Sequence, residues 1–467
     1  MKGENAAVIH MGKPLKENMK LSGKKVLVIG LGKTGLATAR FLVGRAASVA
    51  VTGEKTEKEV AAICRKEGLT GVLSLSPYDL SCLSQVDLIV PSPGVPPANP
   101  ILQEAVRREI PILSEIELAY RFLSCPVIAI TGTNGKTTTT TLIGDILRSA
   151  GKKVFVGGNI GDPLIGFASG GGEADCAVVE VSSFQLQWIE KFCPAVAILL
   201  NTTCDHVNYH GTFAAYRQVK ERIFENQTRR HLAVINADEP SSGLLAQKLA
   251  ARVGYFSSVA PVEKGMFAAA AGLVYISESG KQETYPLDMV RIPGRHNLEN
   301  VMAAIMAARE CGVSAADVRA AIADFKGLPH RIEFTGEKKG AAFYDDSKGT
   351  NVGAVVRALE SFPKPVLLLM GGRDKDGDFE TLAPLIRERV KELFLFGEAR
   401  EIINRLIGGI VKTVSLATMR EAVLSAYDQA TAGDIVLLSP GCASFDEFSD
   451  YKARGDLFKK LVGSLHE

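Results

Sequence analysis

The stretch Thr131-Gly-Thr-Asn-Gly-Lys-Thr-Thr-Thr139 decides how the centre of the chain folds. It follows the apolar segment 127–130 and precedes a helix-like stretch that ends near Gly151. A strand, a glycine-rich turn and a helix in this order hold a phosphate, because backbone N–H groups and the positive helix end meet there. Lys136 would reach the terminal phosphates of a nucleotide, and the Thr137 hydroxyl would ligate Mg²⁺. The stretch therefore predicts ATP or GTP binding.

The pattern departs from the general phosphate-loop motif at one position. Ile130 stands where that motif has its first glycine, five positions before Gly135. The alternative is a Gly/Thr turn ahead of an ordinary helix. The strand and helix context and the intact Gly-Lys-Thr favour the phosphate loop.

Composition indicates a water-soluble globular protein rather than a nucleic-acid or membrane protein. The 467 residues are 46% hydrophobic and 23% charged, and 54 basic against 52 acidic residues leave a net charge of +2. This length suggests about three domains. No apolar run reaches the roughly 18 residues of a spanning helix, and residues 1–22 lack the apolar core of a signal peptide. Eight scattered cysteines without a C-x-x-C pair predict reduced thiols in a cytoplasm.

The first segment alternates strands and helices. We expect strands at 24–29, 48–51 and 86–90, with a G-x-G-x-x-G turn at 30–35 and a helix to about Gly44. This is a doubly wound pattern, and the loop at 91–97 follows a strand end, where such sheets bind ligands.

A nicotinamide dinucleotide is the first candidate ligand for this turn, but the second strand argues against it. That strand ends at Thr52-Gly53, and the nearest acid is Glu54, whereas a ribose-binding acid is expected at the strand end. Another phosphate-bearing ligand, with Lys33 and Thr34 in the turn, fits better.

Two central strands end in side chains suited to a cation. The strand at 177–180 ends in Glu180, which faces either Mg²⁺ or solvent. The strand at 195–200 is followed by a segment that contains His206 and His210, which could be helix neighbours or a zinc pair. A hard cation beside phosphates favours Mg²⁺, with one histidine as ligand.

The last third repeats the α/β alternation, with strands expected at 342–344, 366–370, 392–397 and 434–441 and polar clusters after the strand ends. The predicted fold class is α/β with three domains. They are a Rossmann-like domain at 1–114, a central phosphate-loop domain at 115–327 and a second Rossmann-like domain at 328–467.

The run at 131–137 closely resembles the phosphate loop of the Mur ligase superfamily, whose members join an amino acid to a carboxylate with ATP. Four further blocks agree in order and spacing, at 158–161, 180–186, 205–220 and 296–300. Blocks at 328–331, 346–351 and 439–448, with Arg454-Gly455, resemble the D-glutamate-adding branch. The resemblance covers nearly the whole chain after roughly the first twenty residues.

The resemblance implies a bacterial, cytoplasmic, monomeric enzyme of peptidoglycan precursor synthesis. ATP would phosphorylate the carboxylate of UDP-N-acetylmuramoyl-L-alanine, and the amine of D-glutamate would attack the acyl phosphate. ATP and Mg²⁺ are the implied cofactors, and no nucleic acid or membrane insertion is implied. The alternative is another amide-forming ligase of the superfamily, such as a folylpolyglutamate synthase.

The resemblance also assigns residues, block by block. The implied catalytic residues are Lys136, Glu180, His206 and Lys220, and the implied metal ligands are Thr137, Glu180, His206 and Lys220 as a carbamate. Without the resemblance, Lys220 in its Lys-Glu-Arg run would be read as part of a solvated helix face. The implied ATP contacts are Gly132, Thr133, Asn134, Gly135, Lys136, Thr137, Thr138, Asn300, Arg331 and Asp346.

Two further sets complete the implied site. The uridine-linked substrate would contact Gly32, Lys33, Thr34, Thr52, Ser92, Gly94, Asn159 and Ser182. D-glutamate would contact Lys348, Thr350, Lys375, Ser444 and Tyr451. Cations and hydroxyls of this kind suit a dianionic amino acid. The superfamily more often has Phe where Tyr451 stands.

Overall fold

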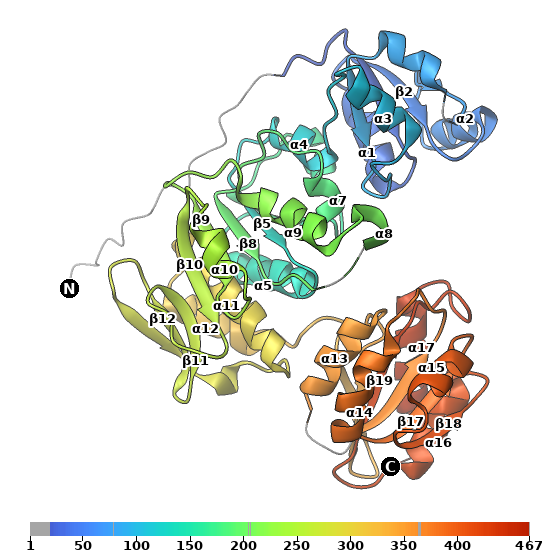
Figure 1. Cartoon of the computed structure of the whole chain (residues 1–467). Helices are drawn as coiled ribbons and strands as arrows, with labels where there is room; N and C mark the ends of the chain where they lie inside the picture. The colour runs from blue at the N-terminus through green and yellow to red at the C-terminus, as the bar shows by residue number, and fades with distance from the viewer. Residues whose placement is uncertain (1–18, 78, 204, 206, 363–365, 467) are drawn as a thin grey trace. The chain divides into compact units, whose positions relative to one another are not determined.

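The computed structural model describes residues 19–77, 79–203, 205, 207–362 and 366–466, apart from the side chains of 207 and 208. The described chain is an α/β protein with three sheets (Figure 1), which confirms the predicted fold class. It divides into two compact units, one made of Met1–Leu287 and Glu299–Ile322 and the other of Asp288–Leu298 and Ala323–Glu467. The domain boundaries predicted at 114/115 and 327/328 stay predictions.

The first sheet of unit 1 is parallel, in the order β3-β2-β1-β4. Alternate residues of β1 face opposite helix layers: Val26 and Val28 pack in the α1 and α2 cluster, and Leu27 and Ile29 pack against α3. This is the predicted doubly wound arrangement. Its elements are β1 Lys25–Ile29, α1 Lys33–Val43, β2 Ser48–Thr52, α2 Glu57–Lys66, β3 Leu73–Ser74, the 3-10 helix η1 Leu80–Gln85, β4 Leu88–Pro91 and α3 Pro100–Arg107.

The second sheet has nine strands in the order β13-β12-β11-β10-β9-β8-β5-β7-β6. The strands from β6 to β11 are parallel, and β12 and β13 extend the sheet in antiparallel fashion. The strands are β5 Val127–Thr131, β6 Val154–Gly158, β7 Cys176–Glu180, β8 Val196–Leu199, β9 Leu232–Asn236, β10 Arg252–Ser257, β11 Gly265–Ala269, β12 Gly272–Ile276 and β13 Gln282–Tyr285.

Helices surround this central sheet, and the expected strands β5, β7 and β8 lie side by side in it. The helices are α4 Glu115–Tyr120, α5 Lys136–Ser149, α6 Leu164–Ser169, α7 Ser183–Leu186, α8 Val207–His210, α9 Phe213–Glu221, η2 Arg222–Phe224, α10 Ser242–Ala246, η3 Leu287–Met289, α11 Arg295–Glu310 and α12 Ala315–Asp324.

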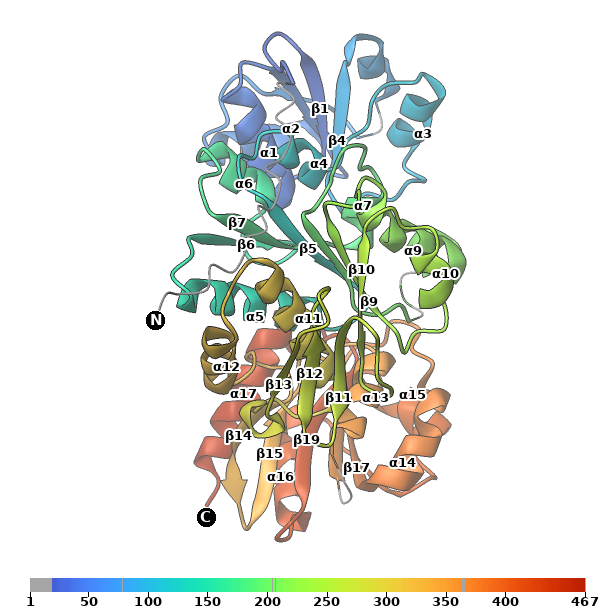
Figure 2. The same cartoon turned by 90° about the vertical axis from the view of Figure 1, so that its left-hand side faces the viewer.

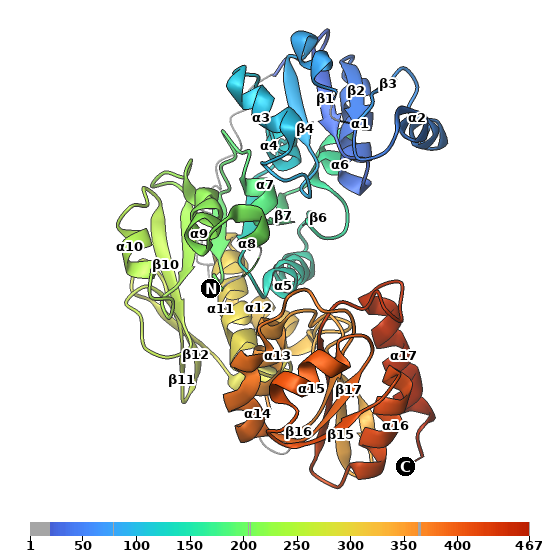
Figure 3. The ribbon, with the colours of Figure 1, turned by 45° about the vertical axis from the view of Figure 1, so that its right-hand side comes forward.

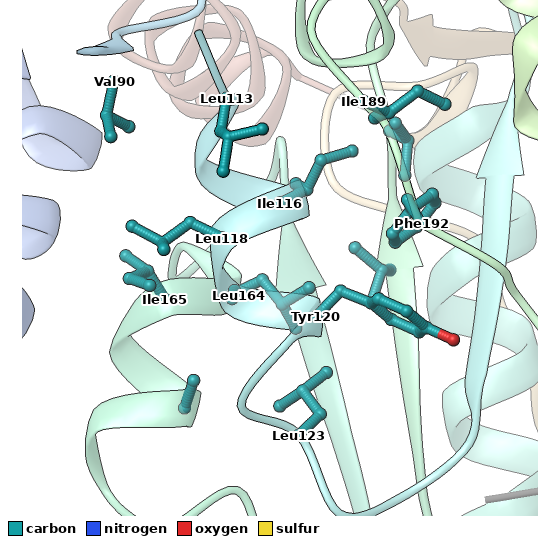
Figure 4. Packing of buried hydrophobic residues seen from close by; sticks show 14 of the residues in the cluster. Val90, Leu113, Ile116, Leu118, Tyr120, Leu123, Leu164, Ile165, Ile189 and Phe192 are labelled. Atoms are coloured by element: carbon teal, nitrogen blue, oxygen red, sulfur yellow. The ribbon is translucent and has the colours of Figure 1, made fainter. Parts of the chain in front are cut away.

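One continuous hydrophobic cluster joins the first sheet to the central sheet. Figure 4 shows Ile116, Leu118 and Tyr120 of α4 packed among Leu164 and Ile165 of α6, with side chains from β4 nearby. The shared burial of apolar surface stabilises the packing of the two sheets within unit 1.

Unit 2 holds a six-stranded sheet in the order β14-β15-β19-β16-β17-β18, parallel except for the edge strand β14. Helices cover both faces (Figures 2 and 3). In β16, Leu368 and Met370 pack with α13, α14 and α15, whereas Leu367 and Leu369 pack with α16 and α17. The elements are β14 Glu333–Lys338, β15 Ala341–Asp345, α13 Val352–Glu360, β16 Val366–Gly371, η4 Phe379–Leu382, α14 Ala383–Arg389, β17 Val390–Phe396, α15 Arg400–Ile407, β18 Lys412–Ser415, α16 Met419–Gln429, β19 Ile435–Gly441 and α17 Tyr451–Ser464.

Among the described residues, no helix combines the length and the apolar character needed to cross a membrane.

Candidate active site

The loop between β5 and α5 has the geometry of a phosphate-binding loop. Gly135 caps α5 with φ +85°, and a Cβ at this position would overlap the side-chain oxygen of Asn300. Only glycine meets both conditions readily. Thr137 and Thr138 lie in the first turn of α5, at the helix end whose N–H groups and positive dipole favour an anion in the loop.

Three residues outside the motif brace this loop. Asn201, two residues after β8 ends, accepts the Asn134 N–H on its side-chain oxygen (2.9 Å) and the Thr133 N–H on its carbonyl oxygen (3.0 Å). The Thr133 hydroxyl lies 3.2 Å from the Tyr216 hydroxyl. On the α5 side, the Thr139 hydroxyl donates to the side-chain oxygen of Asn300 (3.3 Å). The loop is therefore held from β8, α9 and α11.

Two lysines converge on this loop. The ammonium group of Lys136 donates to the carbonyl oxygens of Gly132 (2.9 Å) and Thr133 (3.0 Å). Lys220, from α9, donates to the same Gly132 oxygen and lies over the Tyr216 ring. Burial, with Lys136 nearby, holds the pKa of Lys220 well below its ordinary value. Lys220 is only 1% exposed, so the solvated-face alternative for it is wrong.

Glu180 ends β7 inside the protein rather than in solvent. It is 2% exposed, and its Oε1 accepts a hydrogen bond from the Asn159 side chain (2.8 Å). Its Oε2 is buried and has no hydrogen-bond partner among the described residues. An orphaned buried carboxylate oxygen is costly unless a cation completes it, so this position fits Mg²⁺. His206, another of the predicted metal ligands, lies outside the described residues.

Ser182 is fixed by a chain of buried polar groups. It caps α7, and its hydroxyl donates to Gln185 Oε1 (3.0 Å) and accepts the Gln185 N–H. The Gln185 amide reaches the carboxylate of Glu115 (3.5 Å), which also accepts the Ile165 N–H (2.7 Å). Complete burial raises the pKa of Glu115 to about 7.

The predicted substrate residues of the first domain gather at the carboxyl ends of β1, β2 and β4. Gly32 caps α1 without a side-chain bond, and Thr34 lies in the first turn of that helix. The Ser92 hydroxyl, in the loop after β4, is buried and has no hydrogen-bond partner among the described residues. Gly94 is exposed in the same loop.

Two members of this set have protein partners in the structure. The Lys33 ammonium donates to the Gly161 carbonyl oxygen (2.6 Å) and pairs with Asp162 (2.9 Å), with both side chains well exposed. The Thr52 hydroxyl is buried and donates to the carbonyl oxygen of Ser76 (3.0 Å). Thr52 therefore supports the strand end, whereas Lys33 is accessible to an anion.

In unit 2, the predicted residues follow β15, β16 and β19, which are neighbours in the sheet. Asp346 is buried, and its carboxylate accepts a hydrogen bond from the Ser439 hydroxyl (2.8 Å). Burial raises the pKa of Asp346 to about 7, although Ser439 and the nearby Arg331 lower it. The loops after β16 and β19 are joined by two backbone hydrogen bonds between Arg373 and Ala443.

The structure also places the predicted amino-acid residues of unit 2. The Lys348 ammonium lies 4.1 Å from the centre of the Tyr451 ring, and the Thr350 N–H donates to the Lys348 carbonyl. Lys375 is exposed, and Ser444 is buried. Lys348, Thr350, Lys375 and Ser444 lie on three loops that follow neighbouring strands, and Tyr451 begins α17. The sequence predicts this gathering of polar residues after strand ends.

Sequence reasoning gave no role to Asn201, Tyr216, Glu115 or Gln185. The spacing Ser182-x-x-Gln185 before an apolar residue is a helix-capping signal, so Gln185 could have been found. Asn201 is the second residue after β8, and its place at a strand end is a further available signal. Nothing local marks Glu115, because its partners lie 50 and 70 residues away.

Comparison with known proteins gives this site a family. The chain matches three family profiles: a Mur ligase MurD-like N-terminal domain at 24–114, a Mur ligase middle domain at 130–308 and a Mur ligase glutamate ligase domain at 330–442. The chain therefore belongs to the Mur ligase family.

Curated relatives narrow the family further. A UDP-N-acetylmuramoylalanine–D-glutamate ligase of Syntrophus aciditrophicus is 60% identical over 95% of this chain and 98% of its own length. The ligase of the same name from Geotalea daltonii is 45% identical over 96% of this chain and 99% of its own length. Within the Mur ligases, the chain is a member of the MurD branch.

Solved structures agree on the fold. A pseudomurein peptide ligase type C from Methanothermus fervidus gives a TM-score of 0.60 at 19% identity, covering 95% of this chain and 100% of that chain. The MurC ligase of Thermotoga maritima gives a TM-score of 0.56 at 19% identity, and the match covers 94% of this chain and 99% of that chain. The E. coli FolC structure with ADP gives a TM-score of 0.55 at 19% identity, and the match covers 72% of this chain and 89% of that chain.

Proposed function

We propose that the chain is an ATP-dependent ligase that joins D-glutamate to the carboxylate of UDP-N-acetylmuramoyl-L-alanine. The observation that carries the proposal is the 60% identity, over nearly the full length of both chains, to a relative of that name. The folate-ligase alternative has weaker support, because this chain and FolC share only 19% sequence identity and their similarity concerns the fold alone. A cytoplasmic location fits the need for ATP, and the monomeric state stays a prediction.

The reaction follows from the chemistry of an unreactive carboxylate. A carboxylate oxygen of the alanyl group attacks the γ-phosphorus of ATP, the bond to the bridging oxygen breaks, and ADP leaves. The D-glutamate amine then attacks the acyl carbon, loses a proton, and the tetrahedral intermediate expels phosphate. Both steps depend mainly on positioning and on neutralising charge.

In this proposal the phosphate loop receives ATP. The N–H groups at the start of α5 and the Lys136 ammonium would face the phosphates held by the loop of residues 132–138, with Asn300, Arg331 and Asp346 as further ATP contacts. Mg²⁺, when bound, neutralises phosphate charge, and Thr137, Glu180 and His206 would hold it together with a carbamate on Lys220. The orphaned Glu180 oxygen supports this ligand set.

The two organic substrates are assigned to the remaining two sets of predicted binding residues. UDP-N-acetylmuramoyl-L-alanine would bind at the turn that begins α1, with Gly32, Lys33, Thr34, Ser92 and Gly94, and with Asn159 and Ser182 from the central domain. Thr52 would act as support for the turn. D-glutamate would bind at Lys348, Thr350, Lys375, Ser444 and Tyr451, which offer cations and donors to two carboxylates.

A phosphate-release assay tests the proposal. Release should require ATP, Mg²⁺, UDP-N-acetylmuramoyl-L-alanine and D-glutamate together, with L-glutamate much slower. Equal rates with L-glutamate would contradict the stereochemistry, and turnover of a reduced folate with L-glutamate and no uridine substrate would establish the alternative.

A further inference from the structure

Arg454 is a fully buried cation in unit 2. It lies at the carboxyl ends of the strands whose following loops carry the proposed D-glutamate residues. It lies in the first turn of α17 with 0% of its surface exposed. Its Nε donates to the Ser347 hydroxyl (2.9 Å), and its Nη2 donates to the carbonyl oxygens of Ser347 (2.8 Å) and Cys442 (3.1 Å). Its Nη1 lies 3.5 Å from the Gly371 carbonyl oxygen.

These acceptors belong to three different strand ends. Ser347 follows β15, Gly371 ends β16, and Cys442 follows β19. One planar guanidinium therefore spans the three loops that carry the proposed D-glutamate residues. Lysine offers fewer donors from a single nitrogen and cannot match this fork.

The bonded residues are chain neighbours of the proposed ligand contacts. Ser347 directly precedes Lys348, and Cys442 comes two residues before Ser444. The Ser347 hydroxyl also donates to the Tyr451 carbonyl oxygen (2.8 Å), so the start of α17 belongs to the same network. A shift of Arg454 would move Lys348, Ser444 and Tyr451 together.

Gly455, the residue after Arg454, explains how the guanidinium can be so deeply buried. A Cβ at Gly455 would overlap the ring of His330 and the carboxylate of Asp345, which are hydrogen-bonded to each other (2.7 Å). Glycine thus lets the helix approach the sheet edge closely. Three acids, Asp345, Asp346 and Asp446, lie near enough to favour the charged form of Arg454, and burial lowers its pKa only to about 10.

We infer that Arg454 is a positioning residue for the incoming amino acid, holding the loops of Lys348 and Ser444 in the spacing that a dicarboxylate needs. It does not itself touch the substrate in this inference. The inference rests on the proposed ligase function, and it adds a residue to which neither the family resemblance nor the comparisons assign a role.

The test compares Arg454→Lys and Arg454→Met with the unaltered chain in two reactions. The first is ligation of D-glutamate. In the second, hydroxylamine replaces D-glutamate and captures the acyl phosphate as a hydroxamate, because its nitrogen attacks the acyl carbon without needing a carboxylate site. Both variants should raise the KM for D-glutamate about 10- to 100-fold, the loss expected when hydrogen bonds to a charged group are removed. Hydroxamate formation should stay within about twofold of the unaltered chain.

Arg389 supplies a matched control. It lies just before β17, at the amino end of that strand rather than at the carboxyl ends that Arg454 joins, and its guanidinium donates to the Phe362 carbonyl oxygen (3.0 Å). Arg389→Lys and Arg389→Met should leave the KM for D-glutamate unchanged.

Each outcome decides the inference. An unchanged KM for D-glutamate in both Arg454 variants would overturn it, and so would an equal loss of hydroxamate formation, which indicates general collapse of the unit. Restoration of the KM by Arg454→Lys would also overturn it, because charge rather than the fork would then suffice. If the unaltered chain releases no phosphate with D-glutamate, the proposed function itself has failed.

Discussion

Lys136 and Lys220 donate to one carbonyl oxygen, that of Gly132, each at 2.9 Å. Two ammonium groups this close repel each other, and Lys220 is also buried, so its pKa is held well below the ordinary lysine value. A lowered pKa favours the neutral amine, which is the form that adds to CO₂. The resulting carbamate is an anion, which replaces the repulsion from Lys136 by attraction.

We predict that activity depends on CO₂ and on the amine of Lys220. Lys220→Ala should lose most activity, and a small carboxylic acid such as acetate should restore part of it, because the cavity then accepts a separate carboxylate. The rate is measured with and without acetate, and the exposed Lys248→Ala serves as a control that acetate should not affect. Absence of any rescue would count against the carbamate.

Lys136→Ala should abolish turnover while the protein remains folded. The Gly132 carbonyl keeps its hydrogen bond from Lys220, so the loop backbone does not depend on Lys136. Removing one preorganised donor to developing charge costs about 10²- to 10³-fold in kcat. Phosphate release and thermal unfolding are measured on the same sample, and substantial turnover would refute the phosphate role.

Glu180→Gln should weaken Mg²⁺ dependence without disturbing the fold. The glutamine oxygen can still accept the hydrogen bond from Asn159, but the charge beside the orphaned Oε2 position is lost. The Mg²⁺ concentration for half-maximal activity should rise at least about tenfold, the scale of a lost charged ligand. Asn159→Ala is the companion variant, and its Mg²⁺ requirement should rise less, since it keeps the carboxylate. An unchanged Mg²⁺ requirement in Glu180→Gln would remove Glu180 from the ligand set.

The features predictable from sequence are those with local signals. The loop at 131–139 and the strands before it and beside it carry glycines and apolar runs that fix their structure within a few residues. Strands β11, β12 and β13, at one margin of the central sheet, were not predicted. The edge strand β13 has the sequence Gln-Glu-Thr-Tyr, which lacks an apolar run, and it is recognisable as a strand only through its antiparallel pairing with β12.

The buried charges lay beyond local reasoning. Acidic and basic side chains are ordinarily exposed, so Lys220 and Glu117 would be read as solvated. Glu117 is in fact fully buried, because three consecutive N–H groups, of Glu190, Lys191 and Phe192, donate to one of its oxygens. Such partners lie more than 70 residues away in the chain and become neighbours only in the folded protein.

Glu115 should make stability fall as pH rises. Its ordinary pKa is near 4.5, and burial raises the folded value to about 7. Between these values the folded protein binds a proton that the unfolded chain has lost, so the unfolding free energy decreases with rising pH, by up to about 3 kcal/mol in total. This loss is complete about one pH unit above the folded value. Glu115→Gln is neutral at every pH and should therefore gain stability relative to the unaltered chain between pH 5 and pH 8.

The single tryptophan, Trp188, lines the same small cavity as Glu115, so its fluorescence during urea unfolding reports on this region. Asp346, whose pKa is also raised to about 7, is present in both proteins and cancels in the difference. A difference between the two proteins that stays constant from pH 5 to pH 8 would show that Glu115 is already ionised in the folded state at pH 5.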